Sequence, residues 1–387
     1  MEYGWDKAYD EFRAQVSAFA TQFKTPDVEK ELEDSEGEGP TPGMAKRIRN
    51  AIEAKGGMRM CWPESLGGEG KSPWFQYVLV DELQRHGIPY SLGSAAMIGP
   101  AIEKFGTEEQ KKKYLPGLWS GEITCALGYS EPNAGTDLAS LETGAAKDGD
   151  DWVINGQKLW TSGAHRSTHV WLAARTDPKA PKHRGISMFI VPLSTPGIAV
   201  RPIITMGGTR TNETFYEDVR VPGDALIGEE GRGWYIAANA LDHERVTIGG
   251  GIGHHLSFSR LLAYLREHRP DLLADRAVRT RLAQLRVDLQ CQRALTLTNA
   301  SIVAGGGTPT MEASMVKVWS SELRYRIEST WMDILGRSGL ISDESEGAVL
   351  GGQAENGYRR SPILRFGGGT NEVQRNIIAQ RGLGLPR

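Results

Sequence analysis

The chain has 387 residues, a formal net charge of −3, 39% hydrophobic residues and 24% charged residues. This length exceeds one ordinary hydrophobic core, so we expect two or three packed domains with the composition of a soluble globular protein. The small net charge argues against a nucleic-acid partner, and no apolar run is long enough to span a membrane.

The N-terminus and the cysteines give further exclusions. Residues 1–10 are charged and contain a tryptophan, which is not the pattern of a signal peptide. Cys61, Cys125 and Cys291 show no metal-ligand spacing. We therefore expect reduced thiols, no metal site and a cytoplasmic protein.

The first third of the chain has apolar residues at helical spacing. Helices are predicted at residues 6–23, 45–55, 76–86, 100–105 and 108–119. Thr107 precedes the last of these as its N-cap. Residues 1–120 are thus expected to form a helical N-terminal domain.

The pattern changes to short β-rich runs in residues 121–228, and then returns to helices. Strands are predicted at 169–173, 185–191, 198–202 and 214–221, within a small antiparallel sheet or barrel. Long helices are predicted at 234–268, 275–305 and 311–335, with a break at 305–309. The fold class is mainly α with a central β domain, and residues 229–387 form the third domain.

A polar loop follows Leu127 and carries the most informative sequence of the chain. Residues 128–137 read Gly-Tyr-Ser-Glu-Pro-Asn-Ala-Gly-Thr-Asp. These residue types favour turns over regular structure, and they expose N–H groups and short hydroxyls. Such a loop suits a phosphate or the polar edge of a ring.

Residues 152–160 are predicted to form a hairpin. Asn155-Gly156 is a strong turn signal between two β-rich runs. Trp160 then places an indole beside Thr161 and Ser162, where it could stack on a planar heterocycle while the hydroxyls bond it. Either half alone is equally typical of an ordinary β domain with a well-made turn.

Together the two halves resemble the flavin-binding signature of the acyl-CoA dehydrogenases. The shared motifs are Ser-Glu-Pro-x-x-Gly-Thr-Asp at 130–137 and Asn-Gly-x-Lys-x-Trp-x-Ser at 155–162. The likeness covers nearly the whole chain. It implies an FAD-dependent enzyme with an N-terminal helical domain, an antiparallel β-barrel and a C-terminal four-helix bundle. The FAD contacts that it implies are Leu127, Tyr129, Ser130, Gly135, Thr136, Trp160, Thr161, Ser162, Gly336, Thr370 and Glu372.

The resemblance implies that the catalytic base of this chain lies at a different position from that of most family members. Most family members carry it as a Glu just before a Gly-Thr pair near the C-terminus, but here Gly368 stands at that position. Glu372 is too far along the chain to replace it. Glu244 lies on an apolar helix stripe with Leu241 and Ile248, and desolvation there would raise its pKa as a base requires.

The helix pattern alone favours a buried Glu244 paired with Arg245 or another cation. A branched-chain subset of the family carries its base at this helix position, and this resemblance favours Glu244 as the base. Arg245 could then orient the substrate or stabilise the helix.

Two glycines indicate the kind of substrate. Gly367 and Gly368 replace bulky residues that line the channel of straight-chain family members, so the pocket is wider. The Gly368 N–H could still bond the thioester carbonyl. The resemblance implies a bulky or branched acyl-CoA, such as a sterol or bile-acid side chain, and an electron-transfer flavoprotein as the electron acceptor.

The segments that family members lend to a neighbour's flavin are incomplete. The Phe-Gly of an Arg-x-x-Phe-Gly segment is absent from residues 266–273, and Asp333 and Arg337 depart from a Gln-x-x-Gly-Gly loop. The chain is therefore interpreted as the catalytic subunit of a heterotetramer with a related non-catalytic chain. The alternatives are a homotetramer using Arg266, Arg269 or Arg276, another flavin oxidation on this scaffold, and a non-catalytic subunit.

Overall fold

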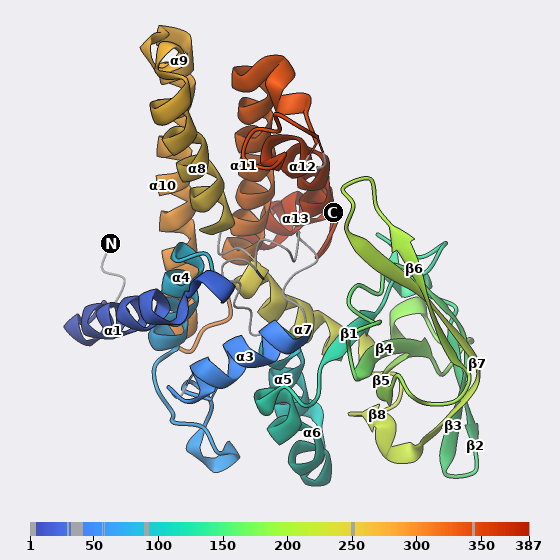
Figure 1. Ribbon diagram of the computed structural model, residues 1–387. Coiled ribbons are helices and arrows are strands. Elements are labelled where there is room, and N and C mark those ends of the chain that lie inside the picture. Colours follow the sequence, from blue (N-terminus) through green and yellow to red (C-terminus); the bar gives the residue numbers. More distant parts are fainter. Residues whose placement is uncertain are drawn as a thin grey trace.

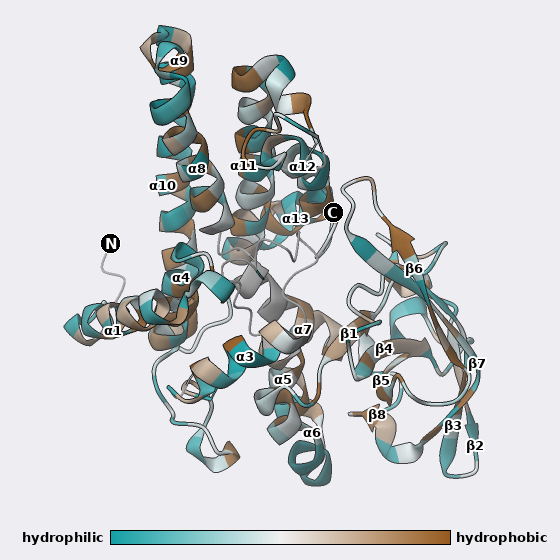
Figure 2. Ribbon diagram, in the orientation of Figure 1, coloured by the Kyte–Doolittle hydropathy of each residue, from teal (hydrophilic) through white to brown (hydrophobic). Residues whose placement is uncertain are grey.

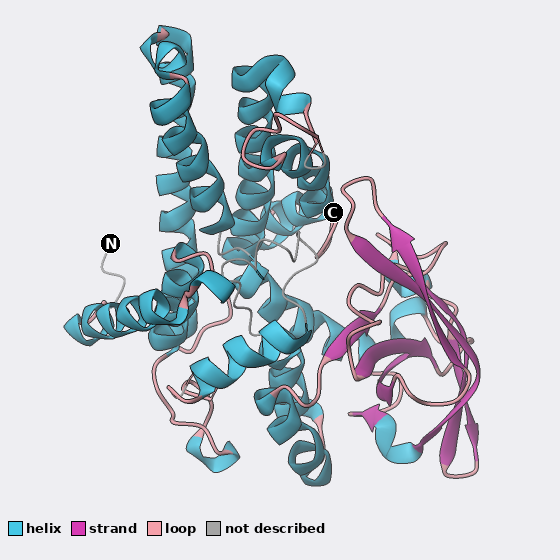
Figure 3. Ribbon diagram, in the orientation of Figure 1, coloured by secondary structure: helices cyan, strands magenta, loops and turns pink. Residues whose placement is uncertain are grey.

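The computed structural model describes residues 5–28, 31, 42–55, 57, 59–88, 93–248, 252–342 and 345–386. Helices and strands occupy separate parts of the molecule, and the strands gather on one side (Figure 3). The N-terminal helices are α1 (Lys7–Phe23), α3 (Pro42–Glu53), α4 (Pro73–Arg85), α5 (Gly93–Phe105) and α6 (Glu108–Ser120).

Local capping explains where two of these helices begin. The side chain of Thr107 accepts from the N–H of Gln110, and the Gln110 side chain bonds the Thr107 N–H in return, which confirms the predicted N-cap of α6. Helix α4 begins three residues earlier than predicted. Ser72 caps it, and Pro73 occupies the first helical position, where a missing N–H costs nothing.

The central domain is a single eight-stranded sheet with the order β6-β7-β3-β2-β4-β5-β8, in which β1 pairs with β4. The β1–β4 and β2–β4 pairs are parallel and the others antiparallel, so the sheet is mixed rather than purely antiparallel. The strands are β1 (Cys125–Gly128), β2 (Gly144–Asp148), β3 (Asp151–Lys158), β4 (His169–Arg175), β5 (Ile186–Pro192), β6 (Ile198–Ile204), β7 (Arg210–Pro222) and β8 (Leu226–Ile227).

The predicted hairpin at 152–160 is wrong. Residues 151–158 form one continuous strand, β3, and the turn lies earlier, between Asp148 and Asp151. Asn155 instead sits opposite an irregularity in β7, where its side chain bonds both the carboxylate and the N–H of Asp218. The Asn-Gly pair therefore marks a β-bulge, and Gly156 supplies its φ of 146°.

The C-terminal part is helical, with long helices α8, α10 and α11 running side by side (Figure 1). The described helices are α7 (Gly233–Ile248), α8 (Ile252–His268), α9 (Pro270–Ala274), α10 (Arg276–Ala304), α11 (Met311–Leu335), α12 (Gln353–Arg360) and α13 (Asn371–Ile377). The predicted break at 305–309 is confirmed. The single helix predicted at 234–268 is described as α7 and α8, and residues 249–251 between them lie outside the described residues.

Helix α7 joins the helical and sheet domains. Ile236, Ala237 and Ala240 are buried in a core cluster shared by the N-terminal helices and one face of β4 and β5, and α7 packs against β5. Separate cores fill the sheet and the C-terminal bundle. Strands β4 and β5 are largely hydrophobic along their length, whereas much of α10 is hydrophilic (Figure 2). No helix in the described part of the chain is both long and apolar enough to cross a membrane.

Candidate active site

A buried ion pair fixes the polar loop that follows β1. The Lys158 ammonium lies 2.7 Å from Oε1 of Glu131 and donates to the Tyr129 carbonyl at 3.1 Å. Lys158 is fully buried, at the end of β3. Glu131 also accepts from the N–H groups of Glu142 and Thr143. The two sequence motifs are thus bound together inside the protein.

Burial acts on both members of this pair. It lowers the pKa of Lys158 to about 8, against the attraction of Glu131, so the ammonium remains largely charged at neutral pH. Burial opposes ionisation of Glu131 as well, but Lys158 and the N–H donors outweigh it, and the pKa of Glu131 is lowered. Neither group is exposed to a ligand, so their role is to hold the loop.

Backbone bonds complete the shape of the loop. Glu131 and Ala134 exchange N–H and carbonyl bonds across a tight turn, and the Leu159 N–H donates to the Ser130 carbonyl at 2.8 Å. The Tyr129 ring is buried, and its hydroxyl accepts from the Trp171 indole N–H at 3.0 Å. Tyr129 can therefore offer only its backbone to a ligand.

The loop residues differ in what they present to solvent. Gly135 and Thr136 are exposed, Ser130 is half-buried, and a Cβ on Gly135 would meet no atom within 4 Å. Leu127 is half-buried in β1, beside Trp171 of β4. The open side of the loop is therefore Gly135-Thr136, where N–H and hydroxyl groups can reach an outside ligand.

Trp160 is a large exposed aromatic residue beyond the end of β3. The residue is 54% exposed, and its φ is +62°, in the left-handed region that non-glycine residues rarely adopt. The next residue, Thr161, is fully buried and its hydroxyl lies 3.2 Å from that of Thr214. The Ser162 hydroxyl lies 2.9 Å from that of Thr211.

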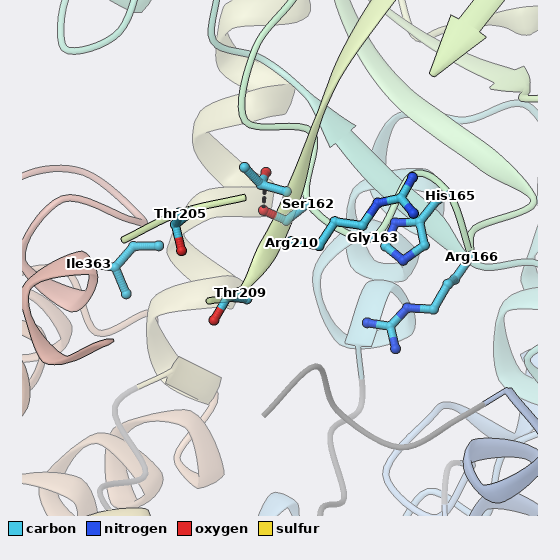
Figure 4. A pocket seen from close by; sticks show the side chains of 9 residues that line it. Ser162, Gly163, His165, Arg166, Thr205, Thr209, Arg210 and Ile363 are labelled. Atoms are coloured by element: carbon cyan, nitrogen blue, oxygen red, sulfur yellow. Dashed lines mark hydrogen bonds between the residues drawn. The ribbon is translucent and has the colours of Figure 1, made fainter. Parts of the chain in front are cut away.

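A pocket of about 140 Å³ opens beside Ser162 (Figure 4). It lies between the loop after β3 and the turn that joins β6 to β7, and Ile363 closes one side. Its polar lining has two guanidinium groups, an imidazole and several hydroxyls, which suit a ligand rich in carbonyl or phosphate oxygens. The lining residues are Ser162, Gly163, His165, Arg166, Thr205, Thr209, Arg210, Thr211 and Ile363.

The glycine loop near the C-terminus is held by a second buried lysine. Lys317 of α11 is 2% exposed, and its ammonium donates to the carbonyls of Arg365 and Gly369 and to Oδ1 of Asn371, at 3.2, 2.7 and 2.9 Å. Gln374, also buried, donates to the Gly368 carbonyl. The carbonyls of Arg365, Gly368 and Gly369 thus accept hydrogen bonds from buried side chains.

The glycines of this loop have conformations that other residues would resist. Gly368 and Gly369 have φ values of +68° and +89°. Gly367 is exposed and Gly368 half-buried. The Thr370 hydroxyl accepts from the Val373 N–H as the N-cap of α13, and Glu372 is exposed in the first turn of that helix.

Gly336 does not join the other predicted cofactor residues. It lies just beyond the C-terminal end of α11, nineteen residues after Lys317, which is roughly 28 Å along a helix. Asp333 close by is paired with Arg281 of α10 at 2.7 Å. This end of the bundle is therefore remote from the glycine loop of the same chain.

Glu244 and Arg245 lie in the last two turns of α7, but their side chains are outside the described residues. The backbone places Glu244 four residues after the fully buried Ala240, hence on the same face of the helix. Leu241, which was predicted to lie on that stripe, packs against the N-terminal core.

The three cysteines are free thiols. Burial raises the pKa of Cys61 to about 11 and that of Cys125 to about 12, so neither provides a reactive thiolate at neutral pH. Within the described residues, no three acidic, His or Cys side chains gather as they would around a metal ion.

Family models match the chain in three successive segments. They are described as the N-terminal, middle and C-terminal domains of acyl-CoA dehydrogenase, and they match residues 6–122, 126–219 and 231–383. The chain belongs to the acyl-CoA dehydrogenase family. It is accordingly an oxidoreductase of a flavin-dependent family.

Three relatives are similar to the chain along its whole length. Acyl-CoA dehydrogenase FadE26 of Mycobacterium tuberculosis is 36% identical, over 100% of this chain and 99% of its own. A solved structure described as the Tcur3481-Tcur3483 steroid ACAD is 39% identical, with a TM-score of 0.90 and complete coverage of both chains. The ChsE4-ChsE5 complex from Mycobacterium tuberculosis is 35% identical, with a TM-score of 0.87 and the same coverage.

The residues that hold the loops of this acyl-CoA dehydrogenase were not predicted as site residues. Lys158, Lys317 and Asn212 are buried and bond loop backbone, but the sequence assigned this role to none of them. For Lys158 a signal was present. It follows the inward-facing Trp152 and Ile154 at even spacing in β3, and a lysine at such a position needs a buried partner.

Proposed function

We propose that this dehydrogenase oxidises a bulky or branched acyl-CoA, of the sterol or bile-acid side-chain type, to its trans-2-enoyl thioester, with FAD as cofactor. The observation that carries the proposal is the glycine loop at 367–369. It has a glycine in place of the usual base, in a backbone conformation that favours glycine, while the loop at 128–137 is fully formed.

The residues around the pocket fit a flavin. Trp160, two residues before the pocket-lining Ser162, offers an exposed indole, and Ser162 and the half-buried Ser130 offer hydroxyls. The proposed contacts also include Leu127, Tyr129, Gly135, Thr136, Thr370 and Glu372. Thr161, which the resemblance also implies, is fully buried and bonded within the protein, so it supports the site without facing the ligand. Bound FAD would supply the acceptor for the hydride that leaves the β-carbon. Trp160 would cover the ring, and the Gly135-Thr136 edge would bind polar groups of the cofactor.

Glu244 is proposed as the base that removes the α-proton. It continues the buried face of α7 that contains Ile236 and Ala240. A carboxylate on such a face loses solvation, which raises its pKa toward the working pH of a general base. The Gly368 N–H would donate to the thioester carbonyl and stabilise the negative charge that develops as the proton leaves. Arg245 is proposed to orient the substrate.

The proposed substrate class is supported by the space at the glycine loop and by the solved structure of a relative. Gly367 and Gly368 leave the loop without side chains, and Gly367 is exposed. One solved relative is described as a steroid ACAD. A wide, glycine-lined floor accommodates a ring or branch that a straight-chain channel would exclude.

We further propose that the active assembly is a heterotetramer with a related chain, and that an electron-transfer flavoprotein reoxidises it. Asp333 is already paired with Arg281, and Gly336 is far from the chain's own glycine loop. The names of two structural relatives, Tcur3481-Tcur3483 and the ChsE4-ChsE5 complex, each join two different proteins. If the chain expressed alone binds stoichiometric flavin and turns over fully, a homotetramer replaces this proposal.

Anaerobic bleaching of bound flavin tests the reaction directly. The purified assembly is mixed with a panel of thioesters, from short straight chains to sterol side chains. We expect bleaching by the bulky thioesters, and its loss in Glu244→Gln with flavin still bound. Glu103→Gln on α5 is the matched control, because Glu103 is a half-buried carboxylate whose pKa burial raises. Unimpaired bleaching in Glu244→Gln would disprove the assignment.

A further inference from the structure

The backbone at Trp160 is held in a conformation that the chain would not adopt by itself. A bulky side chain at a φ of +62° is strained, and such a residue persists only where its surroundings fix it. On the N-terminal side, the fixing contact is the bond from the Leu159 N–H to the Ser130 carbonyl. The contact on the other side comes from β7.

Asn212 of β7 binds the residue after Trp160 at two points. The Thr161 N–H donates to the Asn212 carbonyl at 2.8 Å, and Nδ2 of Asn212 donates to the Thr161 carbonyl at 3.0 Å. Both residues are fully buried. The peptide that follows Trp160 therefore cannot rotate without breaking buried hydrogen bonds.

The rest of the Asn212 amide is bonded to two residues that line the pocket. Its Oδ1 accepts from Nε of Arg210 at 3.1 Å, and its Nδ2 lies 3.1 Å from Nδ1 of His165. With the oxygen on Arg210 and the nitrogen between Thr161 and His165, only one orientation of the amide satisfies the three partners. Figure 4 shows the Arg210 and His165 side chains close to each other at one side of the pocket.

We propose that Asn212 is a positioning residue for the flavin face of the site. Acting through Thr161, it holds Trp160 in its strained conformation and so sets where the indole and the Ser162 hydroxyl lie. This inference rests on the proposed function, because it supposes that a flavin occupies the surface beside Trp160. It assigns Asn212 no direct contact with the substrate or the flavin.

The variant Asn212→Asp distinguishes a role of the Asn212 amide in positioning Trp160 from a role in packing alone. The substitution keeps the size of the side chain and an oxygen for Arg210, but a carboxylate beside that guanidinium cannot donate to the Thr161 carbonyl. Asn212→Ala removes all three side-chain bonds. Asn155→Ala is the matched control, since the exposed Asn155 side chain also bonds β7, at Asp218, but does not contact Thr161 or the pocket-lining residues.

The readouts are the fluorescence of bound flavin, which a stacked indole quenches, and the rate of flavin reduction by saturating acyl-CoA. We expect Asn212→Asp and Asn212→Ala to keep flavin, to raise its fluorescence severalfold, and to slow reduction by about ten- to a hundredfold with KM little changed. Asn155→Ala should match the wild type in both readouts.

Two results overturn the inference while leaving the proposed function intact. One is a wild-type quench and rate in Asn212→Asp. The other is equal losses in Asn155→Ala and the Asn212 variants, which would indicate a general loss of sheet stability. A wild-type assembly that binds no flavin, or whose flavin no thioester reduces, would instead refute the proposed function.

Discussion

Replacing Lys158 with Met should destabilise the sheet domain and release the loop at 128–137. The variant preserves the aliphatic length of the side chain but removes the ammonium that lies 2.7 Å from Glu131 and 3.1 Å from the Tyr129 carbonyl. Glu131 keeps its two backbone N–H donors, yet it becomes a buried carboxylate without a cation. Breaking a buried pair on one side costs about 3–5 kcal/mol.

The assay is urea unfolding, followed with flavin content after gel filtration. Lys147→Met is the matched control in the neighbouring strand, because Lys147 pairs with Glu230 at 2.9 Å but is 63% exposed. That pair should contribute at most about 1 kcal/mol. We expect Lys158→Met to lose both stability and flavin, and the double variant Glu131→Gln/Lys158→Met to recover part of the stability, since no charge is then left buried alone.

The pH dependence gives a sharper test. In the wild type the pKa of Glu131 is lowered from 4.5, so its contribution to stability is present above pH 4.5 and is lost as the pH falls through the folded value. In Lys158→Met, burial remains without the cation, so the pKa should rise above 4.5. Lowering the pH then neutralises the unpaired carboxylate of the variant, which stabilises it, but it weakens the ion pair of the wild type. The difference in free energy of unfolding between the two proteins should therefore narrow. A gap of less than 1 kcal/mol at pH 7, or one that widens toward pH 4, would refute the reasoning.

Two further substitutions test other buried groups. Lys317→Met removes the lysine donor from two loop carbonyls and from Oδ1 of Asn371, which keeps only the Ser321 hydroxyl, so it should cost roughly 1–3 kcal/mol in urea unfolding and raise KM for acyl-CoA. An unchanged KM would separate the loop from substrate binding. Burial lowers the pKa of His254 from 6.5 to about 3, so the unfolded chain binds the extra proton between these values and stability falls as the pH drops below 6.5. The loss should be about 2 kcal/mol at pH 5 and should disappear in His254→Gln but not in His183→Gln, which replaces an exposed histidine.

The sequence predicts the elements of this fold better than it predicts their connections. Helical periodicity located α1, α3, α4, α6, α10 and α11 to within about three residues, because each buries one face along its length, but the helix predicted at 100–105 is only the last part of α5. The Asn155-Gly156 pair led to the wrong prediction of a hairpin at 152–160. Its partner is Asp218, sixty-three residues away, and a short-range turn signal cannot show that a distant strand completes the bulge.

The candidate site shows the same division. The motif residues at 130–137 and 155–162 were recognisable because their residue types are chemically distinctive. Asn212, by contrast, is an ordinary residue in a strand, and only the fold brings its amide to Thr161. The Gly368 substitution is visible in the sequence, but its φ of +68° and its bond from Gln374 are not.

The two loops of the proposed site are built on one physical plan. Each is rich in Gly, Pro or Asn and so lacks the regular bonds of a helix or strand, and each has a buried lysine beneath it. A lysine ammonium has three donors and no acceptor, so it satisfies oxygens of the loop and competes for none of its N–H groups. Those N–H groups are what the oxygens of a flavin or a thioester require. Buried lysines therefore give the loops rigidity without competing for the proposed ligands, which is why Lys158→Met and Lys317→Met should impair binding and stability together.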